Sequence, residues 1–237
     1  MTYNHAVAHN ELVDLLGLVH APVAITFHET VPETADWFDA PMTEPTEDGR
    51  AGRVPASCVF WASAHEATFT TAPEDHGNCS VGRFTHGLVG AEGILDKSDV
   101  GTLLEVGWVT MEAFAGVAAL DRTPAAVTYG PLSESVGDHE VVLLRVSPKQ
   151  MMEIADAISV EFSGKPQCQI IPRAADRNVV AASMGCALSR ARIGMSDDEM
   201  TCAVPAGRIT ELLEGLRMVR RADEAVVGYA LADKARF

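Results

Sequence analysis

Basic residues are scarce in this sequence of 237 residues: 18 lysines and arginines stand against 33 aspartates and glutamates, for a formal net charge of −15 at pH 7. A surface of this charge repels polyanions, so the composition argues against nucleic acid and anionic membranes as partners. Most of the acids are expected to be ordinary solvated surface residues. The 47% hydrophobic and 22% charged residues are typical of a globular protein and exclude the collagenous, fibrous and disordered classes.

Long apolar runs are lacking as well. No stretch approaches the roughly 20 residues of a membrane helix, and the segment MTYNHAVAHNEL has neither the basic nor the apolar region of a secretory signal. We therefore expect a cytoplasmic protein without a membrane partner. The five cysteines are an odd number, which favours thiols or metal ligands over disulfides. None shows the C-x2-C spacing of zinc ribbons and ferredoxins, and the C-x-x-C-H haem motif is missing.

The apolar pattern predicts strands interspersed with helices. Runs rich in β-branched residues predict strands at 23–29, 68–72, 125–130, 140–147, 178–183 and 200–204. Helical spacing predicts helices at 11–20, 57–67, 79–88, 103–120 with a break at Gly107, 147–162 and 205–216, and prolines mark 30–55 as an exposed loop. We expect a single α/β or α+β domain over residues 1–237, with a mixed sheet and covering helices.

One arrangement occurs twice around four cysteines. Cys58 lies 21 residues before Cys79, and Cys168 lies 18 residues before Cys186. Each pair follows the order cysteine, helix or turn, strand, glycine next to or near a second cysteine, helix. This order suggests internally duplicated, pseudo-symmetric halves around residues 22–90 and 140–218. Turns that follow strands collect at one edge of an open sheet, so we expect Cys79 and Cys186 to meet there.

Each of these two thiols would lie at a helix N-terminus, which lowers a thiol pKa and favours the thiolate that a soft metal needs. Our first hypothesis is a [4Fe-4S] cluster held by Cys79 and Cys186, with Cys58 and Cys168 as further ligands. Three ligands would leave one iron open as a Lewis acid for a small-molecule substrate. Four ligands would favour a structural role or redox exchange with an electron-transfer partner. Cys202, which alternates within MTCAV, is expected to be a core residue.

Two further residues are candidates for chemistry at this site. His76, three residues before Cys79, is a candidate base, ligand or hydrogen-bond donor, with Asp75 to orient it. Arg190 and Arg192 follow Cys186 in SRAR, and either could hold an anionic substrate or offset thiolate charge, with Arg190 as our choice.

Three alternatives to the cluster remain open. A metal-free enzyme would use Cys79 as nucleophile and His76 as base. A non-covalent haem or small-molecule module would use a cleft between the halves, and zinc is a further candidate. The sequence leaves a homo-oligomer open in every case.

Several motifs of the chain, taken in order, match those of one protein family whose activity is not established. The resemblance rests on APVAITF, Cys58 opening a helix, EDHGNCSVGRFTHGL, Cys168, MGCALSRARIGMSDDEM and AVPAGRITELLEGL, in this order from about residue 10 to 218. These motifs are similar to those of domain of unknown function 169. The resemblance implies a cysteine-bearing cytoplasmic protein, and the matching positions are Cys58, His76, Cys79, Gly82, Cys168, Cys186 and Arg190. Ser80-Val81 departs from the family's pattern beside Cys79 and bears on the local loop geometry.

Overall fold

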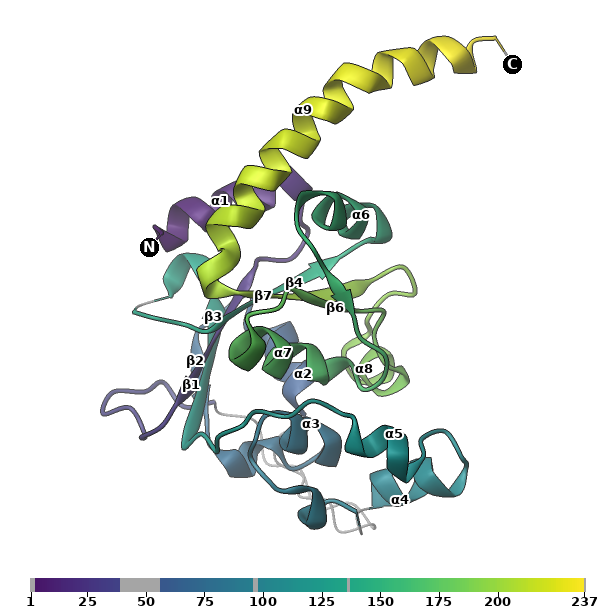
Figure 1. Cartoon of the computed structure of the whole chain (residues 1–237). Helices are drawn as coiled ribbons and strands as arrows, with labels where there is room; N and C mark the ends of the chain where they lie inside the picture. The colour runs from purple at the N-terminus through teal and green to yellow at the C-terminus, as the bar shows by residue number, and fades with distance from the viewer. Residues whose placement is uncertain (1–2, 39–55, 96–97, 136, 237) are drawn as a thin grey trace.

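A seven-stranded mixed sheet forms the centre of the protein in a computed structural model that describes residues 3–38, 56–95, 98–135 and 137–236 (Figure 1). The strands are β1 (Val23–His28), β2 (Phe69–Thr71), β3 (Ala126–Pro131), β4 (Val141–Val146), β5 (Glu161–Phe162), β6 (Ala181–Ser183) and β7 (Met200–Pro205). Their order is β2-β3-β1-β4-β7-β6-β5, with β5 parallel to β6 and the other neighbours antiparallel. The predicted α/β fold with a mixed sheet is therefore confirmed.

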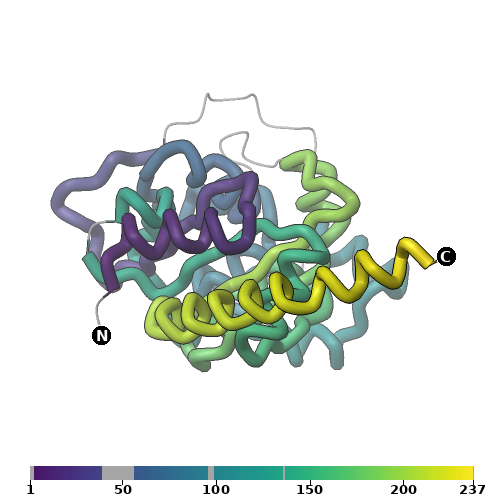
Figure 2. Tube along the Cα trace, turned by 90° about the horizontal axis from the view of Figure 1, so that it is seen from above, coloured from purple at the N-terminus to yellow at the C-terminus, as the bar shows by residue number. Residues whose placement is uncertain are grey.

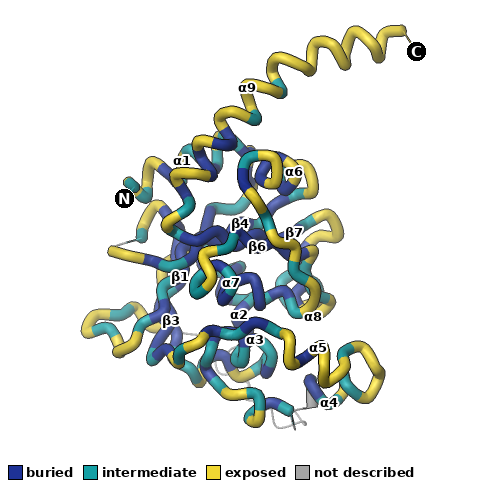
Figure 3. The backbone as a smooth tube through the Cα atoms, in the orientation of Figure 1, coloured by how far each residue is buried: buried dark blue, intermediate teal, exposed yellow. Residues whose placement is uncertain are grey.

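Helices cover both faces of this sheet. They are α1 (His5–Leu16), α2 (Ser57–Ser63), α3 (Ser80–Thr85), α4 (Ser98–Glu105), α5 (Met111–Ala115), α6 (Pro148–Ala157), α7 (Ile170–Arg177), α8 (Ala187–Ile193) and α9 (Ile209–Lys234). Helices α1, α6 and α9 pack on what we call the outer face, and α2 and α7 pack on the inner face (Figure 1). The central strands β4 and β7 are buried along almost their whole length, because helices cover both of their sides (Figure 3).

The pairing of the central strands is symmetric. In the β1–β4 ladder, Ala24 faces Val142, and the flanking pairs are Val23 with Leu143 and Ile25 with Val141. A two-fold rotation about the central Ala24–Val142 pair therefore exchanges β1 with β4 and reproduces the same ladder. The outer ladders match too, since β1 pairs with β3 from Val23–Pro131 to His28–Ala126, and β4 pairs with β7 from Val141–Pro205 to Val146–Met200.

The next strands continue this correspondence. Strand β2 pairs with β3 from Phe69–Tyr129 to Thr71–Val127, and β6 pairs with β7 from Ala181–Ala203 to Ser183–Thr201. Equivalent backbone hydrogen bonds lie at the ends of the β1–β3 and β4–β7 ladders. Leu132 N donates to Pro22 O at 2.8 Å, and Ala206 N donates to Glu140 O at 2.9 Å. We call residues 22–134 the first half and residues 140–208 the second half. The matching elements of the first half thus extend beyond residue 90, as far as β3.

Several predicted elements have different bounds in the structure. The pattern at 147–162 is a helix only to Ala157, after which the chain extends into the edge strand β5. The predicted strand at 178–183 begins later, because Asn178 takes a left-handed conformation (φ 53°) that ends α7. Gly107 (φ 69°) separates α4 from α5, as the predicted break requires. Residues 39–55 of the predicted loop lie outside the described residues.

Helix α9 is longer than the pattern predicts and runs to Lys234. Within the ranges described, no helix combines the length and apolar character that crossing a membrane requires.

Candidate functional site

Four cysteines line one small cavity on the inner face, between the two halves. Its volume is about 30 Å³, and its lining includes Cys58, Cys79, Cys168 and Cys186. All four are free thiols of intermediate burial. Cys202 is also free, but it is fully buried in β7 within the outer-face core, as expected of a core residue.

Cys79 and Cys186 occupy equivalent positions at the starts of two helices. Each is the N-cap of its helix, α3 or α8, and each sulfur accepts a hydrogen bond from the backbone N–H three residues on, from Gly82 or Ser189, at 3.4 Å. A Cβ at Gly82 would lie 3.3 Å from Ser57 Oγ and 3.4 Å from the Cys79 sulfur, so the turn packs closely against both side chains. Both sulfurs therefore already accept backbone N–H groups, as cluster-bound sulfurs commonly do.

Cys58 and Cys168 form the second equivalent pair. Cys58 is the second residue of α2, and Cys168 lies in the 3₁₀ turn Gln167–Gln169 directly before α7. The contacts cross between halves, because α2 of the first half packs against α8 of the second, and α3 packs against the Gln167–Gln169 turn. The four sulfurs thus meet where the halves meet.

Side chains from the opposite half also reach the thiols. The guanidinium of Arg192 of α8 lies near the thiols of Cys58 and Cys79 and favours the charged form of each, and its Nη2 donates to Asn78 O at 2.8 Å. The hydroxyl of Thr85 of α3 favours the charged form of Cys168 in the same way. Arg192 and Thr85 each lie six residues after the N-cap cysteine of their helix. In both helices the side chain at this position therefore acts on a thiol of the opposite half.

Contrary to what its position at a helix N-terminus had suggested, the pKa of Cys79 is not lowered. Burial raises the pKa of Cys58 to about 11, raises the pKa of Cys79, and raises the pKa of Cys168 well above the ordinary value. Arg192 opposes this at Cys58 and Cys79 without reversing it. Desolvation therefore outweighs the helix N-termini, and these thiols remain protonated at neutral pH unless a metal displaces the protons.

Three buried N–H groups of the cavity lining have no hydrogen-bond partner. They belong to the indole of Trp61 (Nε1), the amide of Gln167 (Nε2) and the guanidinium of Arg192 (Nη1). Each such group costs about 1–3 kcal/mol when it is left without an acceptor. The lining is therefore rich in donors and lacks a matching acceptor among the described residues.

His76 lies behind this lining. It is 1% exposed, and its two ring nitrogens hydrogen-bond hydroxyls, Nδ1 with Ser57 Oγ at 3.0 Å and Nε2 with Thr71 Oγ1 at 2.9 Å. Burial lowers its pKa well below the ordinary value. Asp75 accepts from Ala72 N at 2.9 Å and so caps the local turn. His76 thus fixes Ser57, the neighbour of Cys58, and both of its nitrogens are engaged by groups other than Cys79.

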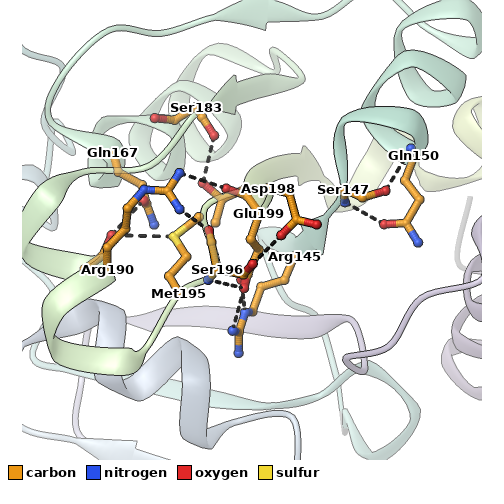
Figure 4. A network of polar contacts seen from close by, with 12 residues as sticks. Arg145, Ser147, Gln150, Gln167, Ser183, Arg190, Met195, Ser196, Asp198 and Glu199 are labelled. Atoms are coloured by element: carbon orange, nitrogen blue, oxygen red, sulfur yellow. Dashed lines mark hydrogen bonds and ion pairs between the residues drawn. The ribbon is translucent and has the colours of Figure 1, made fainter.

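Arg190 and Arg192 have different surroundings although they are two residues apart. Arg190 donates to the carbonyls of Met184, Ser196 and Glu199 and holds the segment that follows α8 (Figure 4). Glu199 in turn pairs with Arg145 (Figure 4). Two helix positions are about 200° apart around the axis, so only Arg192 faces the cysteines. Sequence reasoning chose Arg190 and did not find Trp61 or Gln167, and the spacing from Cys186 was the only available signal for Arg192.

The described side chains do not form a preorganised site for a single metal ion. Tetrahedral zinc with bonds of about 2.3 Å holds its sulfurs roughly 3.8 Å apart. Within the described ranges, no group of three or more His, Cys, Asp or Glu side chains is arranged to hold one ion. The four thiols are thus gathered around one cavity without the close packing of a single-ion site.

Comparison with known proteins identifies a family but no individual relative. No curated protein and no solved structure matches the chain. A family model described as an uncharacterised ArCR matches residues 11–215, which include all four cysteines of the cavity. The chain therefore belongs to the DUF169 family, domain of unknown function 169.

Proposed function

We propose that Cys58, Cys79, Cys168 and Cys186 together hold a [4Fe-4S] cluster. The observation that carries this proposal is the convergence of four thiols, two from each half, on one cavity. Thiolates are the usual ligands of such clusters, and cysteines far apart in sequence can enclose one. A bound metal deprotonates a coordinating thiol outright, so the raised thiol pKa values are no obstacle to ligation.

The size of the cavity argues against a large organic ligand. About 30 Å³ accommodates one or two water molecules, whereas pockets for organic ligands span about 300–1,000 Å³. A core bonded to sulfur needs less room, since metal–sulfur bonds of about 2.3 Å replace contacts of about 3.5–4.0 Å. This size does not favour haem, which is an organic macrocycle.

The unpartnered donors support an anionic occupant. Trp61, Gln167 and Arg192 each bring a buried N–H without an acceptor to the lining. Sulfide and thiolate sulfurs accept such hydrogen bonds, and hydrogen bonds to the sulfurs help to set the reduction potential of a cluster. The donor set of the protein therefore matches the charge of the proposed group.

The proposed role is electron transfer. Four cysteine ligands would leave no iron open to a substrate, and a bound [4Fe-4S] cluster supplies one-electron redox chemistry. In this role Arg192 stabilises negative charge at Cys58 and Cys79, and the backbone N–H groups of Gly82 and Ser189 do the same at the N-cap sulfurs. The partner would be a one-electron donor or acceptor.

Anaerobic quantitation of iron and sulfide tests this proposal. Protein purified or reconstituted without oxygen should contain about four irons and four sulfides per chain and absorb near 400 nm, with bleaching on reduction. Stoichiometric zinc, or a colourless protein without iron after reconstitution, would contradict the cluster. A sharp Soret band after addition of haem would favour a haem protein instead.

A further inference from the structure

The second part of α9 leaves the body of the protein. The buried residues of this helix end at Leu216, and the segment 217–234 extends away from the sheet (Figures 1 and 2). At 1.5 Å per residue these 18 positions span about 27 Å. This segment also lies outside the family match, which ends at residue 215. We call it the α9 arm.

Large apolar side chains of the α9 arm are exposed. Their exposed fractions are Met218 59%, Val226 55%, Val227 49%, Tyr229 77% and Leu231 62% (Figure 3). A helix gains most of its stability in water from packing an apolar face, and an unsupported segment of this length is marginal alone. Clustered exposed apolar residues also mark interaction sites. We therefore expect the apolar side chains of the α9 arm to pack against another surface.

A groove of suitable character lies at the root of the arm. Its volume is about 610 Å³, and it is bounded by the end of α1, by α6 and by α9. Its apolar lining is Leu15, Leu16, Leu216, Val219 and Val227. This is the recognised geometry in which an amphipathic helix lays its apolar face into a groove.

The charges of the groove and of the arm's tip are complementary. The groove is lined by four acids, Asp14, Glu153, Asp223 and Glu224, against the two bases Lys149 and Arg220. The arm ends at Lys234, and Arg236 follows just beyond it, where it pairs with the single acid Asp233 at 3.4 Å, so this end of the chain keeps an excess of one positive charge. A basic end is uncommon in a chain of net charge −15. The acidic groove therefore fits a basic helix end of the kind that this chain itself carries.

We propose that the protein forms a homodimer in which two α9 arms pack antiparallel, the tip of each lying in the groove of its partner. One patch serves both copies, so the contact is isologous and closes at two chains. Val227 and Leu231 supply the apolar anchors, because positions four apart share one face of a helix and Val227 already lines the groove, and Lys234 and Arg236 face the acidic rim. This association is independent of the cysteine cavity, which lies on the opposite face of the sheet.

Light scattering coupled to size-exclusion chromatography tests the proposal on the full chain. Wild-type protein should have twice the chain mass of 25.3 kDa at micromolar concentration. The double substitution Val227→Asp and Leu231→Asp should weaken the dimer at least about tenfold, because it places charge in an apolar contact. Val106→Asp is the matched control, since Val106 is 68% exposed on another surface and should leave the dimer intact.

A charge reversal identifies the contacting surfaces. Lys234→Glu with Arg236→Glu should weaken association, and addition of Asp223→Lys with Glu224→Lys in the same chain should restore it. Circular dichroism checks that each variant remains folded. A monomeric wild type, including one that binds anionic vesicles instead, would overturn the proposal. So would a dimer that survives the arm substitutions, because its interface would lie elsewhere.

Discussion

The two halves share their strand register but fill the inner face with different side chains. The equivalent pairs are Phe60 and Ile170, Trp61 and Ile171, Phe69 and Ala181, and Tyr129 and Ala203, with the first-half residue named first. All eight are buried in one core. Large aromatic residues of one half thus compensate for small residues of the other. The difference teaches that backbone pairing, and with it the position of the cysteines, does not depend on which half supplies the core volume.

The outer face shows the opposite balance. Thr26, His28, Thr128 and Gly130 of the first half correspond to Leu144, Val146, Cys202 and Val204 of the second. The second-half residues are buried under α6 and α9. In the first half His28 and Thr128 hydrogen-bond each other at 2.8 Å beside a cavity of about 320 Å³. The same strand register therefore supports a covered apolar face and a partly hydrated polar one.

The largest expected effect concerns the cysteines, which the two halves contribute equally. Cys58→Ser with Cys79→Ser removes both thiols of the first half, and Cys168→Ser with Cys186→Ser removes both of the second. Either pair should reduce the iron bound after anaerobic reconstitution at least about tenfold, because two thiolates cannot enclose the cluster. Iron and sulfide assays of each variant measure this effect.

Cys202→Ala is the matched control, because this thiol is buried in the outer-face core. It should retain full iron and lose only about 1–2 kcal/mol of stability. Should one double variant keep its iron while the other loses it, the site would belong to a single half, and the functional equivalence of the halves would be wrong.

The outer face offers the next largest contrast. Leu144→Ala should lower the free energy of unfolding by about 2–5 kcal/mol, since Leu144 is fully buried under helices. The equivalent substitution Thr26→Ala should cost less than about 1 kcal/mol, because Thr26 lies at the partly hydrated face. Urea denaturation of the pair measures the difference. Equal losses would show that the first-half face is as tightly packed as the second.

The sequence predicted the elements better than it predicted the surroundings of the site. Strand runs such as 140–147 were found because central strands are continuously apolar, and the observed β4 covers 141–146. The repeated order around the cysteines anticipated that Cys79 and Cys186 line one cavity. These predictions rest on local periodicity and on the position of turns, both of which a single sequence carries.

Contacts between the halves could not be predicted in this way. Arg192 reaches Cys58 across 134 positions of the chain, and only the packing of α8 on α2 brings them together. The helix N-terminus was expected to lower the pKa of Cys79, but burial, which depends on the whole fold, raises it, as it also raises the pKa values of Cys58 and Cys168. The contacts between the halves and the thiol pKa values thus depend on tertiary packing, which local sequence does not predict.

Acid should destabilise the first half through its buried histidines. Burial lowers the pKa of His86 to about 4, while the unfolded chain titrates near 6.5. Stability is then fully present above about pH 6.5 and is lost as the pH falls towards 4, by about 2 kcal/mol between pH 6.5 and 5. The rings packed around His86 are Phe27, Trp61 and His76, and the lowered pKa of His76 acts in the same direction.

Substitution of His86 isolates this contribution. His86→Asn keeps a donor for Gly82 O, which the ring nitrogen Nδ1 contacts at 2.9 Å, and should flatten the pH dependence of urea unfolding. Ile193 lies at the equivalent position, seven residues after its N-cap cysteine, so the second half has no counterpart to this effect. An unchanged slope in the variant would assign the acid sensitivity to other groups.

The smallest expected effect distinguishes the two side chains that cross between the halves. Arg192→Gln should lower the reduction potential of the reconstituted cluster by about 60 mV, the one-electron equivalent of 1.4 kcal/mol, because the positive charge near Cys58 and Cys79 is lost. Thr85→Val removes an uncharged hydroxyl that favours the charged form of Cys168 and should lower the potential by about half as much. Arg190→Gln is the matched control and should leave the potential unchanged, since Arg190 holds backbone carbonyls away from the thiols. Redox titration of the three variants measures this order. Equal shifts for Arg190 and Arg192 would indicate a general effect of surface charge, whereas a shift confined to Arg192 and Thr85 would show that each half tunes the sulfurs of the other.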